Sequence, residues 1–146
     1  KPDAFRGVGG TGRATQALSE IWFPLVSIPI IGIGWGIFNK PLESVACLLF
    51  MAFGDCLTGW IRALKYQSPT KGIIGSLAML GSCLIIAWAF LSPLWLGVLT
   101  AFVATVVEFI CGDVSPIKWL RWADDNFAIP VCSALVYFGI LGLIGG

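Results

Sequence analysis

Hydrophobic residues fall into five long runs that are separated by short polar stretches. Each run has roughly 16–20 residues, the length with which an α-helix crosses the hydrocarbon core of a bilayer. Strands are implausible, because no alternating apolar and polar pattern persists. We therefore expect an all-α bundle of about five transmembrane helices, at about Ile21–Phe38, Leu42–Ile61, Gly72–Leu91, Leu94–Ile110 and Ala128–Leu143.

The polar stretches predict two loops, Arg62–Lys71 and Cys111–Phe127. Ahead of the first run, residues 1–20 are polar and glycine-rich, and residues 21–146 read as one transmembrane domain. The leading segment contains a formal G-x-G-x-x-G at Gly7–Gly12. A dinucleotide-binding fingerprint needs a strand before it and a helix after it in a βαβ unit, which this sequence lacks. We therefore interpret this segment as a lead-in to the first helix.

Composition strengthens the membrane interpretation. Hydrophobic residues make up 58% and charged residues 12% of the chain, whereas a soluble domain carries about 25% charged residues. The absence of His excludes a Ser-His-Asp triad and the common zinc sites. The five cysteines form no CxxC pair, so we expect them to be reduced and structural. A net charge of +1 gives no reason to expect nucleic acid as a partner.

Charge predicts the orientation in the membrane. Five spans would place the N-terminus and both polar loops on one side, together with eight of the nine basic residues. These are Lys1, Arg6, Arg13, Arg62, Lys65, Lys71, Lys118 and Arg121, and Lys40 lies opposite. The positive-inside rule makes the basic side cytoplasmic. Seven of the eight acids gather on the same side, and Glu43 lies opposite, so we expect a multi-pass protein whose reactive side chains face the cytoplasm.

Two acids lie within the predicted spans. On a helix, Asp55 shares a face with Thr58, Gly59 and Arg62, which is compatible either with a structural ion pair or with a catalytic or metal-binding carboxylate. Glu108 shares a face with small residues, which mark the packed side of a membrane helix: Gly97, Ala101 and Ala104. Charges inside a membrane cost about 2.5–3.5 kcal/mol on insertion scales, so such acids are functional candidates. The small residues could also pack against a second copy in a homodimer.

Two further segments carry polar groups beside predicted helix starts. Lys71 begins the third helix with Thr70 as a candidate N-cap, and Gly72, Gly75 and Ser76 leave backbone N–H groups approachable. A helix start beside a lysine is a ready anion site, although a basic residue there also satisfies the positive-inside rule. The Asp124-Asp125-Asn126 segment could cap the fifth helix, or it could hold Mg²⁺ and the phosphates bound to that ion.

The order and spacing of four short motifs resemble the CTP-dependent polyprenol kinase family, which includes dolichol and phytol kinases within the membrane cytidylyltransferase-like group. The motifs are Gly54-Asp55, Lys71 with Gly75-Ser76-Leu77-Ala78, Val107-Glu108, and Asp124-Asp125-Asn126 before Ile129-Pro130. The resemblance extends from about Gly12 to Gly146, and Ile74 stands where the family usually has Glu.

The resemblance implies that residues 21–146 are a catalytic domain that moves the γ-phosphoryl group of CTP, or of another nucleoside triphosphate, to a membrane isoprenoid alcohol. It implies that Asp55, Glu108 and Asp125 bind Mg²⁺ and deprotonate the alcohol, with Asp124 as a further metal ligand. The nucleotide and its phosphates would be contacted by Arg62, Lys71, Gly75, Ser76 and Asn126. Two alternatives stay open, namely a cytidylyltransferase acting on a lipid phosphate and a non-enzymatic transporter or assembly subunit.

Overall fold

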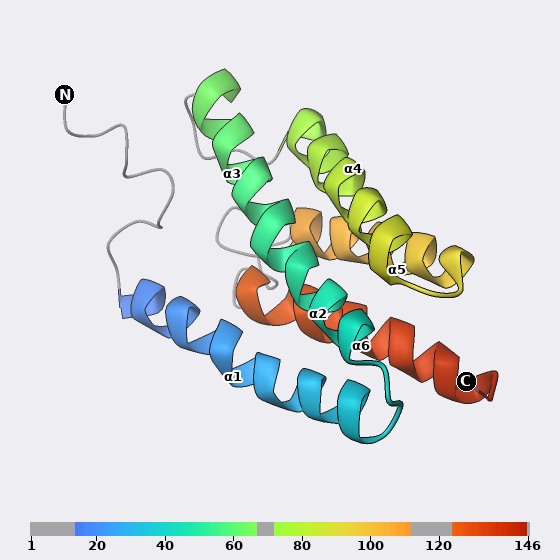
Figure 1. Ribbon diagram of the computed structural model, residues 1–146. Coiled ribbons are helices and arrows are strands. Elements are labelled where there is room, and N and C mark those ends of the chain that lie inside the picture. The colour runs from blue at the N-terminus through green and yellow to red at the C-terminus, as the bar shows by residue number, and fades with distance from the viewer. Residues whose placement is uncertain (1–13, 67–71, 112–123, 146) are drawn as a thin grey trace.

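The computed structural model describes residues 14–66, 72–111 and 124–145, and every regular element in these ranges is helical. The elements are α1 (Ala14–Gly36), α2 (Pro41–Leu49), η2 (Phe50–Asp55), α3 (Cys56–Ile61), η3 (Arg62–Tyr66), α4 (Ile73–Phe90), α5 (Leu94–Ile110) and α6 (Asp125–Leu143). The elements from α2 to η3 follow one another without a break, so the described chain forms five rods (Figure 1).

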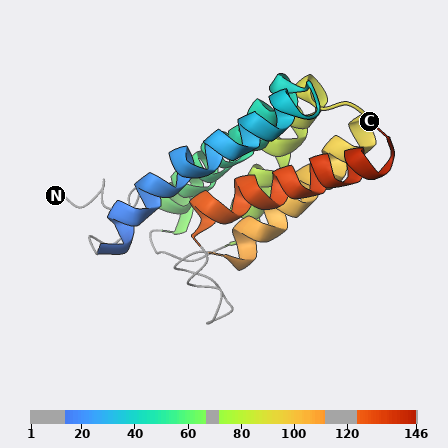
Figure 2. The ribbon, with the colours of Figure 1, turned by 90° about the horizontal axis from the view of Figure 1, so that it is seen from below.

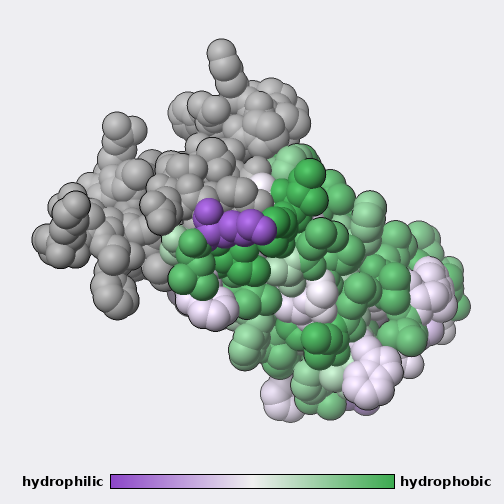
Figure 3. Space-filling view, turned by 90° about the horizontal axis from the view of Figure 1, so that it is seen from above, coloured by the Kyte–Doolittle hydropathy of each residue, from purple (hydrophilic) through white to green (hydrophobic). Residues whose placement is uncertain are grey.

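The rods have the length and composition of a helical membrane protein. Among the described residues, three helices are at least 18 residues long and apolar enough to cross a bilayer: Pro41–Lys65, Ile73–Phe90 and Asp125–Leu143. Two shorter apolar helices, Ile21–Gly36 and Leu94–Ile110, accompany them. Apolar residues also cover most of the described surface on the face that Figure 3 presents. The all-helical membrane class predicted from the hydrophobic runs is therefore supported.

The bundle has two distinct ends, because short turns join neighbouring antiparallel rods. The turn before α2 contains Asn39 at φ 53°, a left-handed conformation that Asn tolerates better than most residues. Lys40 next to it forms an ion pair with Glu43 at 3.1 Å. This turn, the turn at 91–93 and the end of α6 lie at one end of the bundle, whereas η3 and the start of α6 lie at the other (Figures 1 and 2).

The centre of the bundle is filled by a mixture of large side chains and residues small enough to let helices approach closely. In the described residues the fully buried positions include Ala46, Cys47, Phe50, Met79, Cys83, Ala87, Leu96, Ala101, Ala104, Ile129 and Tyr137. α4 packs on α5, α5 on α6, and α6 on α1. The five cysteines form no disulfide among the described residues, and Cys47, Cys83 and Cys111 are buried.

Several helix boundaries differ from those predicted. α1 begins at Ala14, inside the segment expected to be a polar lead-in. The second rod continues as helix through η3 to Tyr66, so Arg62 and Lys65 lie in helical turns and not in a loop. α6 begins at Asp125, earlier than the predicted Ala128. The physical reason is that hydrophobicity marks only the apolar part of a helix. Polar residues can continue a helix beyond that part, and at α6 the side chain of Asp124 caps the helix before its apolar run begins.

Candidate functional site

The motif segments singled out in the sequence lie on four rods and toward the same end of the bundle. Asp55 closes η2, Gly75 and Ser76 lie in the first turn of α4, Glu108 lies in the last turn of α5, and Asp125 opens α6. η2 packs on α4, α4 on α5, and α5 on α6, which makes these segments successive neighbours (Figure 1).

Asp55 lies at the end of an unusual helical turn. The stretch Phe50–Asp55 winds as a π-helix, and π turns are rare and are frequently found at functional sites. Asp55 itself is half-buried. The preceding Gly54 is buried against α4, and a Cβ added there would overlap Met79 Sδ and lie 2.8 Å from Met79 Cε. The absence of a side chain at Gly54 therefore leaves the space that the Met79 side chain fills between η2 and α4.

Thr58 joins the two motifs that contain Gly54 and Gly75. Its hydroxyl donates to Gly54 O at 2.7 Å, the usual bond to the carbonyl four residues earlier, and lies 3.4 Å from Gly75 O on α4. A Cβ on Gly75 would meet Thr58 Cγ2 at 3.0 Å. Asp55 precedes Thr58 by three residues. At 1.5 Å per residue, Asp55 lies about 5 Å further than Thr58 from the η3 end of the rod.

This packing changes the interpretation of the third predicted helix. Gly72 occupies the N-cap position of α4 without a side-chain cap, so the helix starts at Ile73 and not at Lys71. Gly75 is buried on Thr58, which gives the glycine a packing role that the sequence did not reveal. Thr70 and Lys71 lie outside the described residues. The backbone of Arg62 opens η3, and its side chain is outside the described part of the structure.

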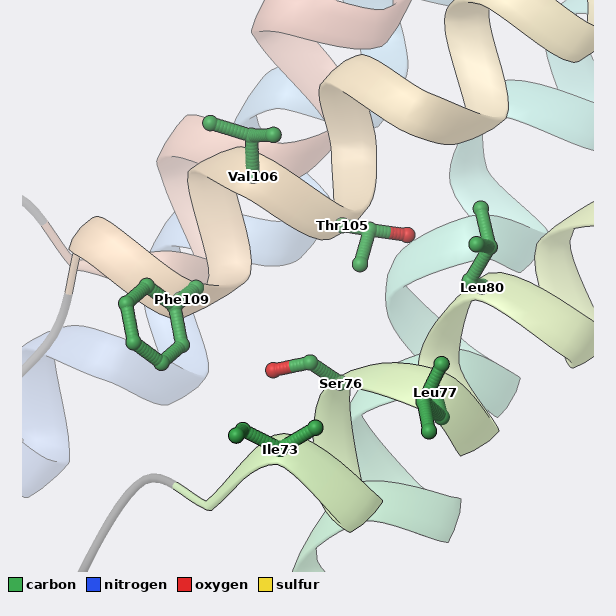
Figure 4. Close-up of a pocket in the computed structure, with 7 residues that line it drawn as sticks. All are labelled: Ile73, Ser76, Leu77, Leu80, Thr105, Val106 and Phe109. Carbon is green, nitrogen blue, oxygen red and sulfur yellow. The ribbon is translucent and has the colours of Figure 1, made fainter.

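Ser76 faces a groove between α4 and α5 (Figure 4). The groove has a volume of about 240 Å³ and is lined by Ile73, Ser76, Leu77, Leu80, Thr105, Val106 and Phe109. Ser76 Oγ is buried and has no hydrogen-bond partner among the described residues. Thr105 Oγ1, across the groove, donates to Ala101 O at 2.9 Å. The sequence analysis missed this groove and the role of Thr105, since neither shows in the spacing along one helix.

Glu108 lies inside the bundle with no exposed surface. Gly97, Ala101 and Ala104 are buried on the same helix, which confirms the predicted packed face of α5. Two residues after Glu108, α5 ends at Ile110. The carboxyl group is therefore held by protein near the end of the bundle where the other motif segments lie, and it does not face the surrounding medium.

The Asp124-Asp125-Asn126 segment forms the start of α6. Asp124 Oδ1 accepts a hydrogen bond from Asn126 N at 2.9 Å, which confirms the capping interpretation for Asp124. Asp125 Oδ1 also accepts from Asn126 N, at 3.2 Å. One residue later, the ring of Phe127 packs edge-on against Trp22 of α1, with centroids 5.2 Å apart. This contact fixes the start of α6 against α1, and with it the positions of the Asp124 and Asp125 carboxylates.

The predicted magnesium ligands do not form a closed metal cage. Among the described residues, no group of three or more His, Cys, Asp or Glu side chains lies close enough together to hold a metal ion. Mg²⁺ commonly takes only one or two protein carboxylates and completes its octahedral shell with water and substrate phosphates. The oxygen donors of Asp55, Glu108, Asp124 and Asp125 suit that chemistry, and the assignment of a magnesium site stays a prediction.

Searches of family models, curated proteins and solved structures find no match for this chain. The class that the fold defines is an all-helical bundle of membrane type with carboxylates near one end. The resemblance to polyprenol kinases therefore rests on the four sequence motifs alone and stays a prediction.

Proposed function

We propose that this protein is a membrane lipid kinase that transfers the γ-phosphoryl group of CTP, or of another nucleoside triphosphate, to the hydroxyl of an isoprenoid alcohol. The observation that supports this best is the arrangement of the four motif segments on neighbouring rods toward one end of the bundle. Phosphoryl transfer needs mainly positioning and charge neutralisation, and such an arrangement can supply both.

In the proposed reaction, the alcohol oxygen attacks the γ-phosphorus while the bond from that phosphorus to the bridging oxygen breaks. CDP leaves when CTP is the donor, and the alcohol proton passes to a carboxylate of Asp55, Glu108 or Asp125. Mg²⁺ held by these carboxylates and Asp124 would neutralise charge on the transferred group. Arg62 and Lys71 would contact the phosphates, Gly75 would contribute a backbone group, and Asn126 would complete the nucleotide shell.

We further propose that all five rods cross the bilayer and that the end holding η3 and the start of α6 faces the cytoplasm. α5 has 17 residues, the lower limit for a helical span, and α1 is longer when its polar first turns are included. This orientation follows the unequal distribution of basic residues, and it places the carboxylates where nucleotides are available.

The test uses the detergent-solubilised protein with Mg²⁺, γ-labelled CTP and a panel of isoprenoid alcohols, with γ-labelled ATP in parallel. A kinase yields label in an organic-soluble lipid phosphate, and the products are CDP and that phosphate. A cytidylyltransferase instead requires a lipid phosphate and releases pyrophosphate. Folded protein that transfers no label and shows no nucleotide-dependent thermal shift would contradict both enzymatic proposals.

An Asp55→Asn variant provides the control within the chain. The substitution keeps the size of the side chain and removes its charge, so a proposed metal ligand or base is lost while the half-buried packing is retained. We expect this variant to fold with the parent Tm and to lose transfer. Full activity in a folded Asp55→Asn protein would contradict the role proposed for this carboxylate.

A further inference from the structure

Ser76 differs from most hydroxyl-bearing residues in the described helices. Six others donate to a backbone carbonyl three or four residues earlier: Ser27, Ser44, Thr58, Ser82, Thr100 and Thr105. The Ser76 hydroxyl does not bond to Gly72 O, although Ser76 N reaches that oxygen at 3.2 Å. Figure 4 shows the hydroxyl pointing away from α4 and toward α5. A buried hydroxyl without a partner is costly, which indicates that something else provides one.

The groove in front of Ser76 has the size and chemistry of a site for a hydrocarbon chain. An apolar cavity of about 150 Å³ is large enough to hold benzene, so about 240 Å³ accommodates at least one five-carbon isoprene unit. Thr105 already uses its hydroxyl proton within α5, which leaves Ser76 as the polar contact toward the groove among its described lining residues. Ile73 is 74% and Leu77 61% exposed, so the groove opens outward, where lipid surrounds a membrane protein.

The groove also lies beside the proposed reaction site. Its α5 lining residues, Thr105, Val106 and Phe109, surround the position of Glu108 along the helix. Glu108 is fully buried, whereas Val106 and Phe109 are exposed, so at this level of α5 the carboxylate faces the interior of the bundle and the groove faces outward. A lipid seated in the groove from the bilayer side would therefore bring its polar end to the level of Glu108.

We propose that the α4–α5 groove binds the hydroxyl-bearing end of a lipid alcohol, with its first isoprene unit against Leu77 and Val106 and its oxygen hydrogen-bonded to Ser76 Oγ. This proposal rests on the proposed lipid kinase function and deepens it, since it assigns Ser76 to the acceptor lipid and not to the nucleotide. A second groove, of about 400 Å³ between α1 and α6, has only apolar lining residues and includes Leu135. No lining side chain in the described part of this groove carries a hydroxyl, and the groove serves as the internal comparison.

The first test locates the lipid directly. The full chain in detergent is irradiated with an isoprenoid alcohol that carries a diazirine in its first isoprene unit, without nucleotide, and the labelled peptides are identified by mass spectrometry. We expect label on residues 73–80 and 105–109. Label confined to residues 127–139, or labelling that unmodified alcohol does not displace, would overturn the proposal.

The second test measures the contact with Ser76. Replacing a hydroxyl that lacks a protein partner by a hydrogen atom removes no bond within the protein, so Ser76→Ala should keep or raise the Tm. We expect the KM for the alcohol to rise about 2- to 12-fold, the value of one neutral hydrogen bond, with the KM for CTP unchanged. Ser133 is the matched control, because its buried Oγ also lacks a hydrogen-bond partner among the described residues and it does not line this groove. An unchanged KM in Ser76→Ala would overturn the proposed contact.

Enlarging one side chain in each groove distinguishes the two grooves as lipid sites. It also distinguishes a failure of the groove assignment from a failure of the kinase proposal. Val106 and Leu135 are both exposed, so phenylalanine fits at either position, and Val106→Phe narrows the α4–α5 groove while Leu135→Phe narrows the other. We expect only Val106→Phe to raise the alcohol KM and to reduce photolabelling. If the α4–α5 groove is labelled but no phosphoryl group is transferred, the lipid site stands and the kinase proposal fails. If transfer occurs while only Leu135→Phe raises the KM, the kinase proposal stands and the groove assignment fails.

Discussion

The hydroxyl of Tyr137 on α6 forms hydrogen bonds with both backbone groups of Ser92, at the turn between α4 and α5. It donates to Ser92 O at 2.6 Å and accepts from Ser92 N at 3.3 Å. The ring is fully buried and packs edge-on against Phe138. One side chain therefore fixes the turn at the end of the bundle opposite the motif carboxylates Glu108 and Asp125, and it holds α6 in its position along α5.

We expect Tyr137→Phe to lower the free energy of unfolding by about 0.5–1.5 kcal/mol for each hydrogen bond lost, since the ring and its packing remain. Thermal unfolding in detergent measures the change, with Leu135→Ala as the control because Leu135 is 68% exposed. Catalytic parameters should change little, because the contact lies at the far end of the bundle. A Tyr137→Phe protein with the parent stability would show that water replaces the lost bonds at this turn.

Gly54 should tolerate substitution poorly, in contrast to Gly59 and Gly81. A Cβ at this position overlaps Met79 Sδ and lies 3.5 Å from Cys83 Sγ, so Gly54→Ala would force the fully buried Met79 side chain to repack. Overpacking of this kind costs about 1–3 kcal/mol. A Cβ added at Gly59 or Gly81 would meet nothing within 4 Å, and Ala there should be neutral or stabilising by up to about 1 kcal/mol.

The measurement is thermal unfolding of the three glycine variants side by side. The double variant Gly54→Ala/Met79→Ala tests the cause, because shortening Met79 removes the atoms with which the new methyl group collides. We expect the double variant to lose less stability than the sum of the two single substitutions. Additive losses would show that the Gly54 effect does not arise from this contact.

The sequence predicted the five rods and the packed face of α5 because both depend on patterns within one helix. Glu108 and Ala104 lie on one face by helical periodicity alone, and both are buried. The π-helical turn before Asp55, the contact between Thr58 and Gly75, and the groove at Ser76 were not predicted. Each arises where two rods meet, and the spacing along a single helix carries no information about its neighbour.

The orientation of the second rod can be tested with cysteines at its two ends. Asn39, in the turn before α2, and Lys65, in η3, are both exposed. In right-side-out vesicles, a membrane-impermeant maleimide should label Asn39→Cys and should reach Lys65→Cys only after the vesicles are opened. Because Cys56 is also exposed, the substitutions belong in a background with the five native cysteines replaced. Labelling of both positions from the same side would show that this rod does not cross the membrane.

Glu108 and Glu43 form a matched pair for testing the carboxylate chemistry, because they lie toward opposite ends of the bundle. Glu108 is fully buried in the last turn of α5, whereas Glu43 pairs with Lys40 at 3.1 Å in the turn at the far end. Glu108→Gln keeps the shape of the side chain and removes its charge and basicity. If Glu108 binds Mg²⁺ or takes the alcohol proton, kcat should fall about 10²- to 10⁴-fold, the usual contribution of a positioned base.

Glu43→Gln should leave kcat within about twofold of the parent, since the partly buried Lys40–Glu43 pair lies toward the opposite end of the bundle from the proposed site. Burying a charge is costly unless its surroundings compensate for it, so a purely structural Glu108 should become more stable, or equally stable, as the neutral amide. A rise in Tm with a large loss of kcat would therefore mean that the protein keeps a costly buried carboxylate for catalysis. A change in Tm without any change in kcat would assign Glu108 to packing and move the search for the base to Asp55 and Asp125.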